Sequence, residues 1–148
     1  MKKLLVSACL LGTPCRYDGK SKPNDAVIKL SDCYNLIPVC PEVDGGLPTP
    51  RVPSERIGDR VMMKDGRDVT ENYFKGAEYA LSLCIYNDIT CAILKERSPS
   101  CGKGCIYDGT FTGTLTNRDG VTAELLKKNG ITVLGETEIA EMEKLYEG

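Results

Sequence analysis

Cysteine is the residue type that sets the chemistry open to this chain, which has eight cysteines and no histidine in 148 residues. Without imidazole, neither a serine–histidine triad nor a histidine metal site can be built, so proton transfer falls to Glu, Asp, Tyr, Lys or Cys. Any metal must be held by thiolate or carboxylate, and thiolates favour zinc or iron–sulfur clusters. The function therefore depends on which thiols come together.

Three of the cysteines, Cys9, Cys40 and Cys101, follow short apolar runs and adjoin loop sequence that contains glycine or proline. In an open parallel sheet the carboxyl ends of the strands share one edge, and ligands bind there. These three thiols would converge at that edge. Three thiolates on rigid strand ends suit an iron–sulfur cluster with one iron left open.

The other cysteines have simpler interpretations, because a free cysteine is commonly a small buried apolar residue. We interpret Cys33, Cys84 and Cys91 in this way, since they fall within predicted helices or a predicted strand. Cys15 and Cys105 lie in loops at the same expected edge of the sheet. The sequence leaves both of them unassigned.

Polar residues near these cysteines could supply acid–base and hydrogen-bonding chemistry. Glu42 lies two residues after Cys40, and a carboxylate in that position is a candidate general base. Ser98 and Ser100 offer two hydroxyl donors shortly before Cys101, and Asp18 brings a second carboxylate into the first loop. Arg16 and Arg51 add positive charge to the same loops. The competing interpretation is that the two acids and the two arginines are solvated or fix loops through salt bridges.

Four short apolar runs predict strands, and none alternates cleanly, which is typical of a sheet covered on both faces. These runs are Lys3–Ala8, Leu36–Val39, Thr90–Lys95 and Ile131–Leu134. Helical patterns occupy Asp25–Tyr34, Glu71–Asn87, Val121–Asn129 and Glu136–Tyr146. The alternation predicts a single domain over residues 1–148 with an α/β fold, a three-layer sandwich around a mainly parallel, Rossmann-like sheet of about four strands.

Local signals add detail at the ends of these elements. Thr70 and Asp119 are placed to cap the second and third predicted helices, and Gly130 to end the third. The segment Arg60–Arg67 reads as a small β-hairpin that turns at Asp65-Gly66. This hairpin ends a long segment rich in proline and glycine, and a loop of that length in a compact domain is usually functional.

Composition is that of an ordinary soluble protein, with 41% hydrophobic and 27% charged residues. The net charge of −2 argues against a broad nucleic-acid-binding surface, and no apolar stretch is long enough to span a membrane. The first eleven residues fit either a short leader peptide or a buried parallel strand. We expect a cytoplasmic protein with reduced thiols, in which clustered cysteines indicate metal binding or catalysis.

Several motifs occur in order along nearly the whole chain, from Ser7 to beyond Gly120. They include Ser7-Ala8-Cys9-Leu10-Leu11-Gly12, Cys15-Arg16-Tyr17-Asp18-Gly19, Cys40-Pro41-Glu42, Ser98-Pro99-Ser100-Cys101-Gly102 and Ile106-Tyr107-Asp108-Gly109-Thr110-Phe111. Together they resemble a bacterial family that was long described only as a domain of unknown function and that includes thiouracil desulfidase.

The resemblance implies a [4Fe-4S] cluster held by three cysteines, which match Cys9, Cys40 and Cys101. One iron would stay free to take the sulfur of a small thiolated substrate such as thiouracil. The implied reaction is a non-redox desulfidase reaction in which activated water attacks the ring carbon and sulfur leaves as sulfide. Glu42 matches the acid/base position, and Ser98 would orient or protonate the substrate. Asp18 would belong to the same polar shell.

Two other functions are compatible with the cysteine pattern. A cluster-free persulfide carrier or sulfurtransferase would need a single thiol of low pKa. A zinc-stabilised binding domain usually has four ligands in close knuckles, whereas no C-x2-C is present. Within the cluster interpretation, Cys15 or Cys105 could join or replace a ligand. The sequence leaves the oligomeric state open.

Overall fold

Four parallel strands form the centre of the structure, in the order β2-β1-β5-β8. Their bounds are Lys3–Ser7 for β1, Asn35–Val39 for β2, Cys91–Leu94 for β5 and Thr132–Gly135 for β8. The computed structural model describes residues 1–146, so the last two residues of the predicted domain lie outside the described residues. All four predicted strands are confirmed, as is the parallel sheet.

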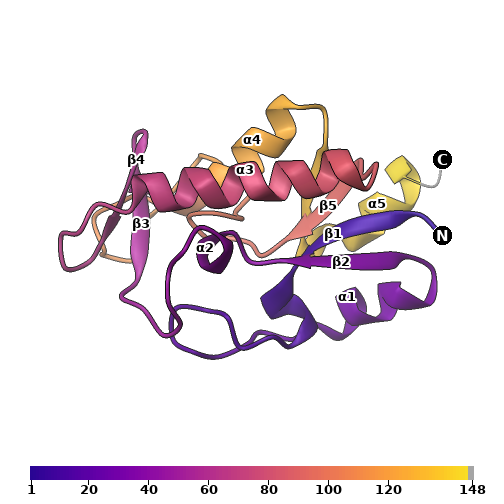
Figure 1. Cartoon of the computed structure of the whole chain (residues 1–148), viewed down its shortest axis with the longest axis horizontal. Coiled ribbons are helices and arrows are strands. Elements are labelled where there is room, and N and C mark those ends of the chain that lie inside the picture. The colour runs from indigo at the N-terminus through magenta and orange to yellow at the C-terminus, as the bar shows by residue number, and fades with distance from the viewer. Residues whose placement is uncertain (147–148) are drawn as a thin grey trace.

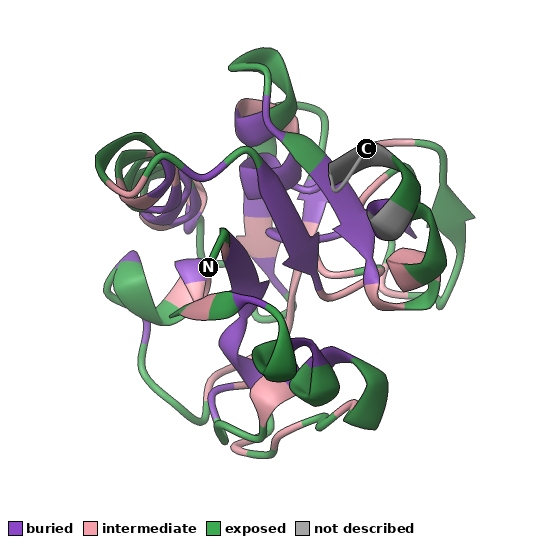
Figure 2. Cartoon of the chain, turned by 90° about the vertical axis from the view of Figure 1, so that its right-hand side faces the viewer, coloured by how far each residue is buried: buried purple, intermediate pink, exposed green. Residues whose placement is uncertain are grey.

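Helices cover both faces of this sheet (Figures 1 and 2). One face carries α3 and α4, and the other carries α1 and α5. Their bounds are Asp25–Lys29 for α1, Thr70–Tyr86 for α3, Val121–Lys128 for α4 and Ile139–Tyr146 for α5. Within residues 1–146, no helix combines the length and the apolar character that crossing a membrane requires.

Side chains that alternate along β1 divide the core between the two faces. Leu4 packs in a cluster with Val27 and Met142, on the face of α1 and α5. Leu5 packs with Ala80 and Leu126, on the face of α3 and α4. Because successive residues of a strand point to opposite faces, one strand serves both cores. The predicted three-layer sandwich is confirmed.

Shorter elements connect these layers. They are the 3-10 helices η1 (Ala8–Leu11), η2 (Leu30–Asp32) and η3 (Glu136–Glu138), the helix α2 (Pro41–Asp44), and the strand pairs β3 (Ser54–Ile57) with β4 (Arg60–Met63) and β6 (Ile106–Tyr107) with β7 (Leu115–Thr116). Both strand pairs are antiparallel. They lie outside the central sheet.

Three predictions about local structure are wrong. Cys33 is exposed, because the helix tightens into η2 and leaves Tyr34 in the buried position. Thr70 does not cap α3: the Asp68 carboxylate accepts the Thr70 N–H at 2.9 Å. Asp119 does not cap α4, since its carboxylate accepts the Gly104 N–H at 2.7 Å and the first N–H groups of α4 donate to loop carbonyls.

Two further turn predictions have different outcomes. Gly130 ends α4 with φ +79°, as expected for a residue that follows a helix. The hairpin of Arg60–Arg67 is displaced, because β4 pairs with β3 and the turn between them contains Gly58. The Asp65-Gly66 turn exists but is followed by a single bridge between Met62 and Asp68. The sequence missed β3, which is interrupted by charged residues.

Candidate active site

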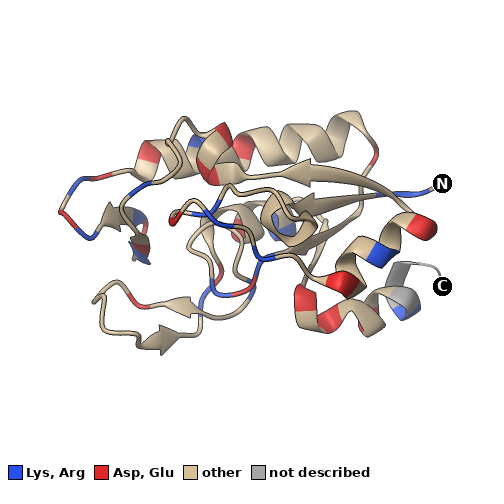
Figure 3. Cartoon of the chain, turned by 90° about the horizontal axis from the view of Figure 1, so that it is seen from below, with Lys and Arg blue, Asp and Glu red and all other residues tan. Residues whose placement is uncertain are grey.

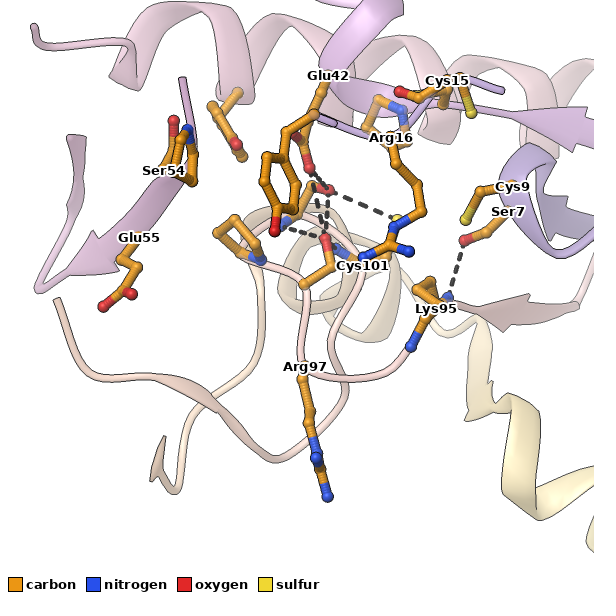
Figure 4. Close-up of a pocket in the computed structure, with 18 of the residues that line it drawn as sticks. Ser7, Cys9, Cys15, Arg16, Glu42, Ser54, Glu55, Lys95, Arg97 and Cys101 are labelled. Atoms are coloured by element: carbon orange, nitrogen blue, oxygen red, sulfur yellow. Dashed lines mark hydrogen bonds between the residues drawn. The ribbon is translucent and has the colours of Figure 1, made fainter. Parts of the chain in front are cut away.

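A cavity of about 620 Å³ opens at the carboxyl edge of the parallel sheet (Figure 4). Cys9, Cys40 and Cys101 all line it, together with Cys15. The three predicted cysteines therefore share one cavity, and their role as cluster ligands stays a prediction. Cys105, which is half-buried in a neighbouring loop, is not among the residues that line this cavity.

Each of the three cysteines is positioned by the end of a different strand. Cys9 lies in η1, directly after β1, and Cys40 is the residue that precedes α2, directly after β2. Cys101 lies in the turn after β5. All three are free thiols. The parallel sheet explains the convergence, because its strands all end at the same edge.

Burial and mutual contact keep the thiols of Cys15, Cys40 and Cys101 protonated. Burial is the main cause that raises the pKa of Cys101 to about 12. The contact with Cys15, followed by burial, raises the pKa of Cys40 far above its ordinary range. The contact with Cys40 lowers the pKa of Cys15. The Cys9 thiol and burial have a larger opposite effect, so the pKa of Cys15 is raised to about 11. A metal bound by Cys40 and Cys101 must therefore displace their protons.

The donor set fits an iron–sulfur cluster. Cys9, Cys40 and Cys101 reach one cavity from three separate elements, and none is engaged in a disulfide. A cluster distributes its cysteine ligands over several irons, so its thiols need not meet at one point. Across the described residues, no three Cys, Asp or Glu side chains lie close enough together to hold a single metal ion.

Glu42 extends into the cavity from the first turn of α2 and is held there by Arg51 (Figure 4 shows Glu42). Both Nε and Nη2 of Arg51 lie 3.1 Å from Oε1 of Glu42. The guanidinium is buried and also donates to the Cys15 carbonyl at 3.0 Å. Arg51 thus connects the candidate base to the cysteine loop. The sequence suggested a solvated or loop-fixing role for Arg51, and only the folded loop shows that its partners are Glu42 and the Cys15 carbonyl.

A chain of hydroxyl groups approaches the other carboxylate oxygen of Glu42. Ser98 Oγ accepts N–H groups from Ser100 and Cys101, both at 3.2 Å, so its own proton is left to donate. Ser98 and Ser100 Oγ are 2.9 Å apart, and Ser100 Oγ donates to Glu42 Oε2 at 3.0 Å. The donors therefore run from Ser98 through Ser100 to the carboxylate. The sequence predicted both hydroxyls as possible donors but placed only Ser98 among the catalytic residues.

Asp18 is not among the residues that line the cavity. Its carboxylate accepts the Lys20 N–H at 3.0 Å, and its other oxygen lies 3.9 Å from Nη1 of Arg16. Arg16 itself lines the cavity (Figure 4). Any effect of Asp18 on the site would pass through Arg16, and its membership of the polar shell stays a prediction.

Basic side chains outnumber acidic ones around the cavity. The lining includes Arg16, Lys22, Arg51, Lys64, Lys95 and Arg97 against Glu42, Glu55 and Glu96. Figure 3 shows Lys and Arg segments among the loops at the middle of the molecule. This excess of positive charge would offset the negative charge that several thiolates bring into one cavity.

Comparisons with known proteins agree on one family. The family model described as 2-thiouracil desulfurase matches residues 4–138. A relative from Bacillus subtilis (strain 168), the uncharacterized protein YbbK, is 42% identical over 146 residues, which are 92% of this chain and 97% of the relative. The solved structure of the [4Fe-4S]-dependent thiouracil desulfidase TudS is 46% identical, with 99% of each chain covered and a TM-score of 0.94. The chain therefore belongs to the 2-thiouracil desulfurase family.

Proposed function

We propose that this protein is a [4Fe-4S]-dependent desulfidase that removes sulfur, as sulfide, from a small thiolated compound such as thiouracil. The observation that carries the proposal is that Cys9, Cys40, Cys101 and Glu42 line one cavity. The likeness to TudS, an enzyme described as [4Fe-4S]-dependent, supports it. Cys9, Cys40 and Cys101 would hold the cluster.

When bound through three thiolates, the cluster supplies an open iron that acts as a Lewis acid toward a thiocarbonyl sulfur. The residues of the chain supply the water chemistry. The oxygen of water forms a bond to the ring carbon, the carbon–sulfur bond breaks, and sulfur leaves as sulfide. No electrons are gained or lost overall, so the reaction needs no reductant.

Glu42 would take the proton of the attacking water. Arg51 occupies Oε1, so the carboxylate has a fixed orientation and Oε2 faces the hydroxyl groups. Ser98 and Ser100 would then orient the substrate or return a proton to the substrate, since their hydroxyls form a hydrogen-bonded chain that leads to Oε2 of Glu42. A general base of this kind typically contributes about 10²- to 10⁴-fold to the rate.

The iron content of anaerobically purified protein tests the ligand assignment. We expect about four irons per chain and a broad brown absorption. Cys9→Ser, Cys40→Ser and Cys101→Ser should each lose most of the iron, whereas Cys105→Ser, a thiol outside the cavity lining, should keep it. Full iron in any of the first three variants would remove that residue from the ligand set. Zinc in place of iron would favour a zinc-stabilised binding domain.

A further inference from the structure

Tyr73 carries a buried hydroxyl group that forms no hydrogen bond of ordinary geometry within residues 1–146, although the side chains of Ser54 and Glu42 are near enough to interact with it. The residue belongs to α3, is 1% exposed and lines the cavity. Ser54 Oγ, from β3, is likewise buried without a partner and lines the same cavity. Buried polar atoms without partners are rare and costly in folded proteins. Two of them beside one cavity indicate a role that packing does not explain.

The position of Tyr73 is fixed relative to Glu42 by close contact between their helices. A Cβ atom added at Gly76 would lie 1.8 Å from the Pro41 carbonyl oxygen, so α3 and α2 meet backbone to backbone. Asn72 Nδ2 also donates to the Gly45 carbonyl at 2.9 Å. Tyr73 lies between these two contacts along α3, on the segment that supports the helix carrying Glu42.

The surroundings of Tyr73 make it a donor. Burial most of all, and then the negative charge of Glu42, raise the pKa of Tyr73 well above its ordinary value. The phenol therefore keeps its proton. An ionised carboxylate can accept about four hydrogen bonds. Arg51 Nε and Nη2 occupy Oε1, and Ser100 donates to Oε2 at 3.0 Å. The one proton of the Ser98 hydroxyl is directed to Ser100 at 2.9 Å, while Ser98 Oγ lies 3.5 Å from Oε2. Glu42 can thus accept a further donor.

We propose that Tyr73 is a positioning residue for Glu42: its hydroxyl donates a hydrogen bond to the carboxylate and holds it toward the cavity, with Ser54 as the second hydroxyl of the pair. The inference rests on the proposed role of Glu42 as the base. A phenylalanine would fill the same space without a buried polar atom, so apolar packing gives no reason for the hydroxyl.

Tyr73→Phe tests this role because it removes one oxygen atom. We expect kcat for sulfide release to fall about 10- to 100-fold, with KM changed less than about twofold and full iron content. The matched control is Thr122→Val, which removes another buried hydroxyl without a partner, on α4 and outside the cavity lining. It should keep the wild-type kcat. An unchanged kcat in Tyr73→Phe would overturn the proposal.

A double variant shows whether Tyr73 acts through Glu42. In a Glu42→Gln background, Tyr73→Phe should lower kcat less than about twofold further, because the carboxylate that it positions is already gone. If the fold-losses in kcat of the two single variants multiply in the double variant, the proposal is contradicted.

The thermal midpoint of the iron-loaded proteins gives a readout that does not depend on activity. Tyr73→Phe should lower Tm by at least about 2 °C more in the wild-type background than in a Glu42→Leu background, because leucine has no oxygen to accept the Tyr73 hydroxyl. Equal shifts would overturn the inference. An iron-loaded wild-type protein that releases no sulfide would instead contradict the proposed function, and the Tm comparison would still decide the role of Tyr73.

Discussion

At the residue scale, the Glu42 carboxylate divides its oxygens between two kinds of partner. The Arg51 guanidinium engages Oε1 through two nitrogens, and Ser100 donates to Oε2. Arginine suits this place because its rigid fork fixes the plane of a carboxylate, whereas a lysine ammonium is a single mobile charge. The orientation of the proposed base therefore depends on Arg51.

Arg51→Lys should lower kcat for sulfide release about 10- to 100-fold with full iron content. The charge is kept, but the two-nitrogen contact with Glu42 and the contact with the Cys15 carbonyl cannot both be reproduced. Arg60→Lys, at an exposed position on β4, is the matched control and should leave kcat unchanged. A wild-type rate in Arg51→Lys would show that Glu42 needs no such support.

At the element scale, the contact between α2 and α3 determines where Glu42 lies. Gly76→Ala would place a methyl group on the Pro41 carbonyl, so the two helices must separate. We expect the free energy of unfolding to fall by about 2 kcal/mol, because overpacking outweighs the gain in helix propensity of roughly 1 kcal/mol. Urea unfolding measures it, with Ser82→Ala on the exposed side of α3 as the control. A stabilised Gly76→Ala would contradict the close packing.

The start of α3 gives a pH-dependent prediction. The Thr70 hydroxyl and N–H, followed by Arg60, lower the pKa of Asp68 to about 2. Because the folded pKa lies below the unfolded value of about 3.9, Asp68 stabilises the protein above pH ~4, and this contribution is lost as pH falls toward about 2. The difference in unfolding midpoint between wild type and Asp68→Asn should be constant near neutral pH and vanish near pH 2. A constant difference at every pH would contradict this role.

At the scale of the whole molecule, the parallel sheet and the placement of three cysteines at its carboxyl edge could be predicted, because both follow from local sequence patterns. Apolar runs indicate buried strands, and a parallel sheet then brings Cys9, Cys40 and Cys101 to one edge. The roles of Arg51 and Tyr73 could not be predicted. Each depends on contacts between segments far apart in the chain, and local sequence patterns do not predict such contacts.

Local sequence patterns also missed strand β3 and assigned the wrong cap to α4, again because the partners lie far away in the chain. β3 contains Glu55 and Arg56, which read as loop residues, yet Arg56 is 3% exposed and pairs with Glu124 at 2.6 Å. The start of α4 resembles a site for a side-chain cap at Asp119, but its N–H groups donate to the carbonyls of Pro99 and Ser100. Tertiary partners replaced the local ones on which sequence rules depend.

The proposed function can be measured as sulfide release from 2-thiouracil by the anaerobic, iron-loaded protein. We expect sulfide and uracil in equal amounts without any added reductant. Glu42→Gln should keep its iron and release sulfide at least about 100-fold more slowly. An iron-loaded wild-type protein that releases no sulfide, or releases it only with a reductant, would show that this protein is not a non-redox desulfidase.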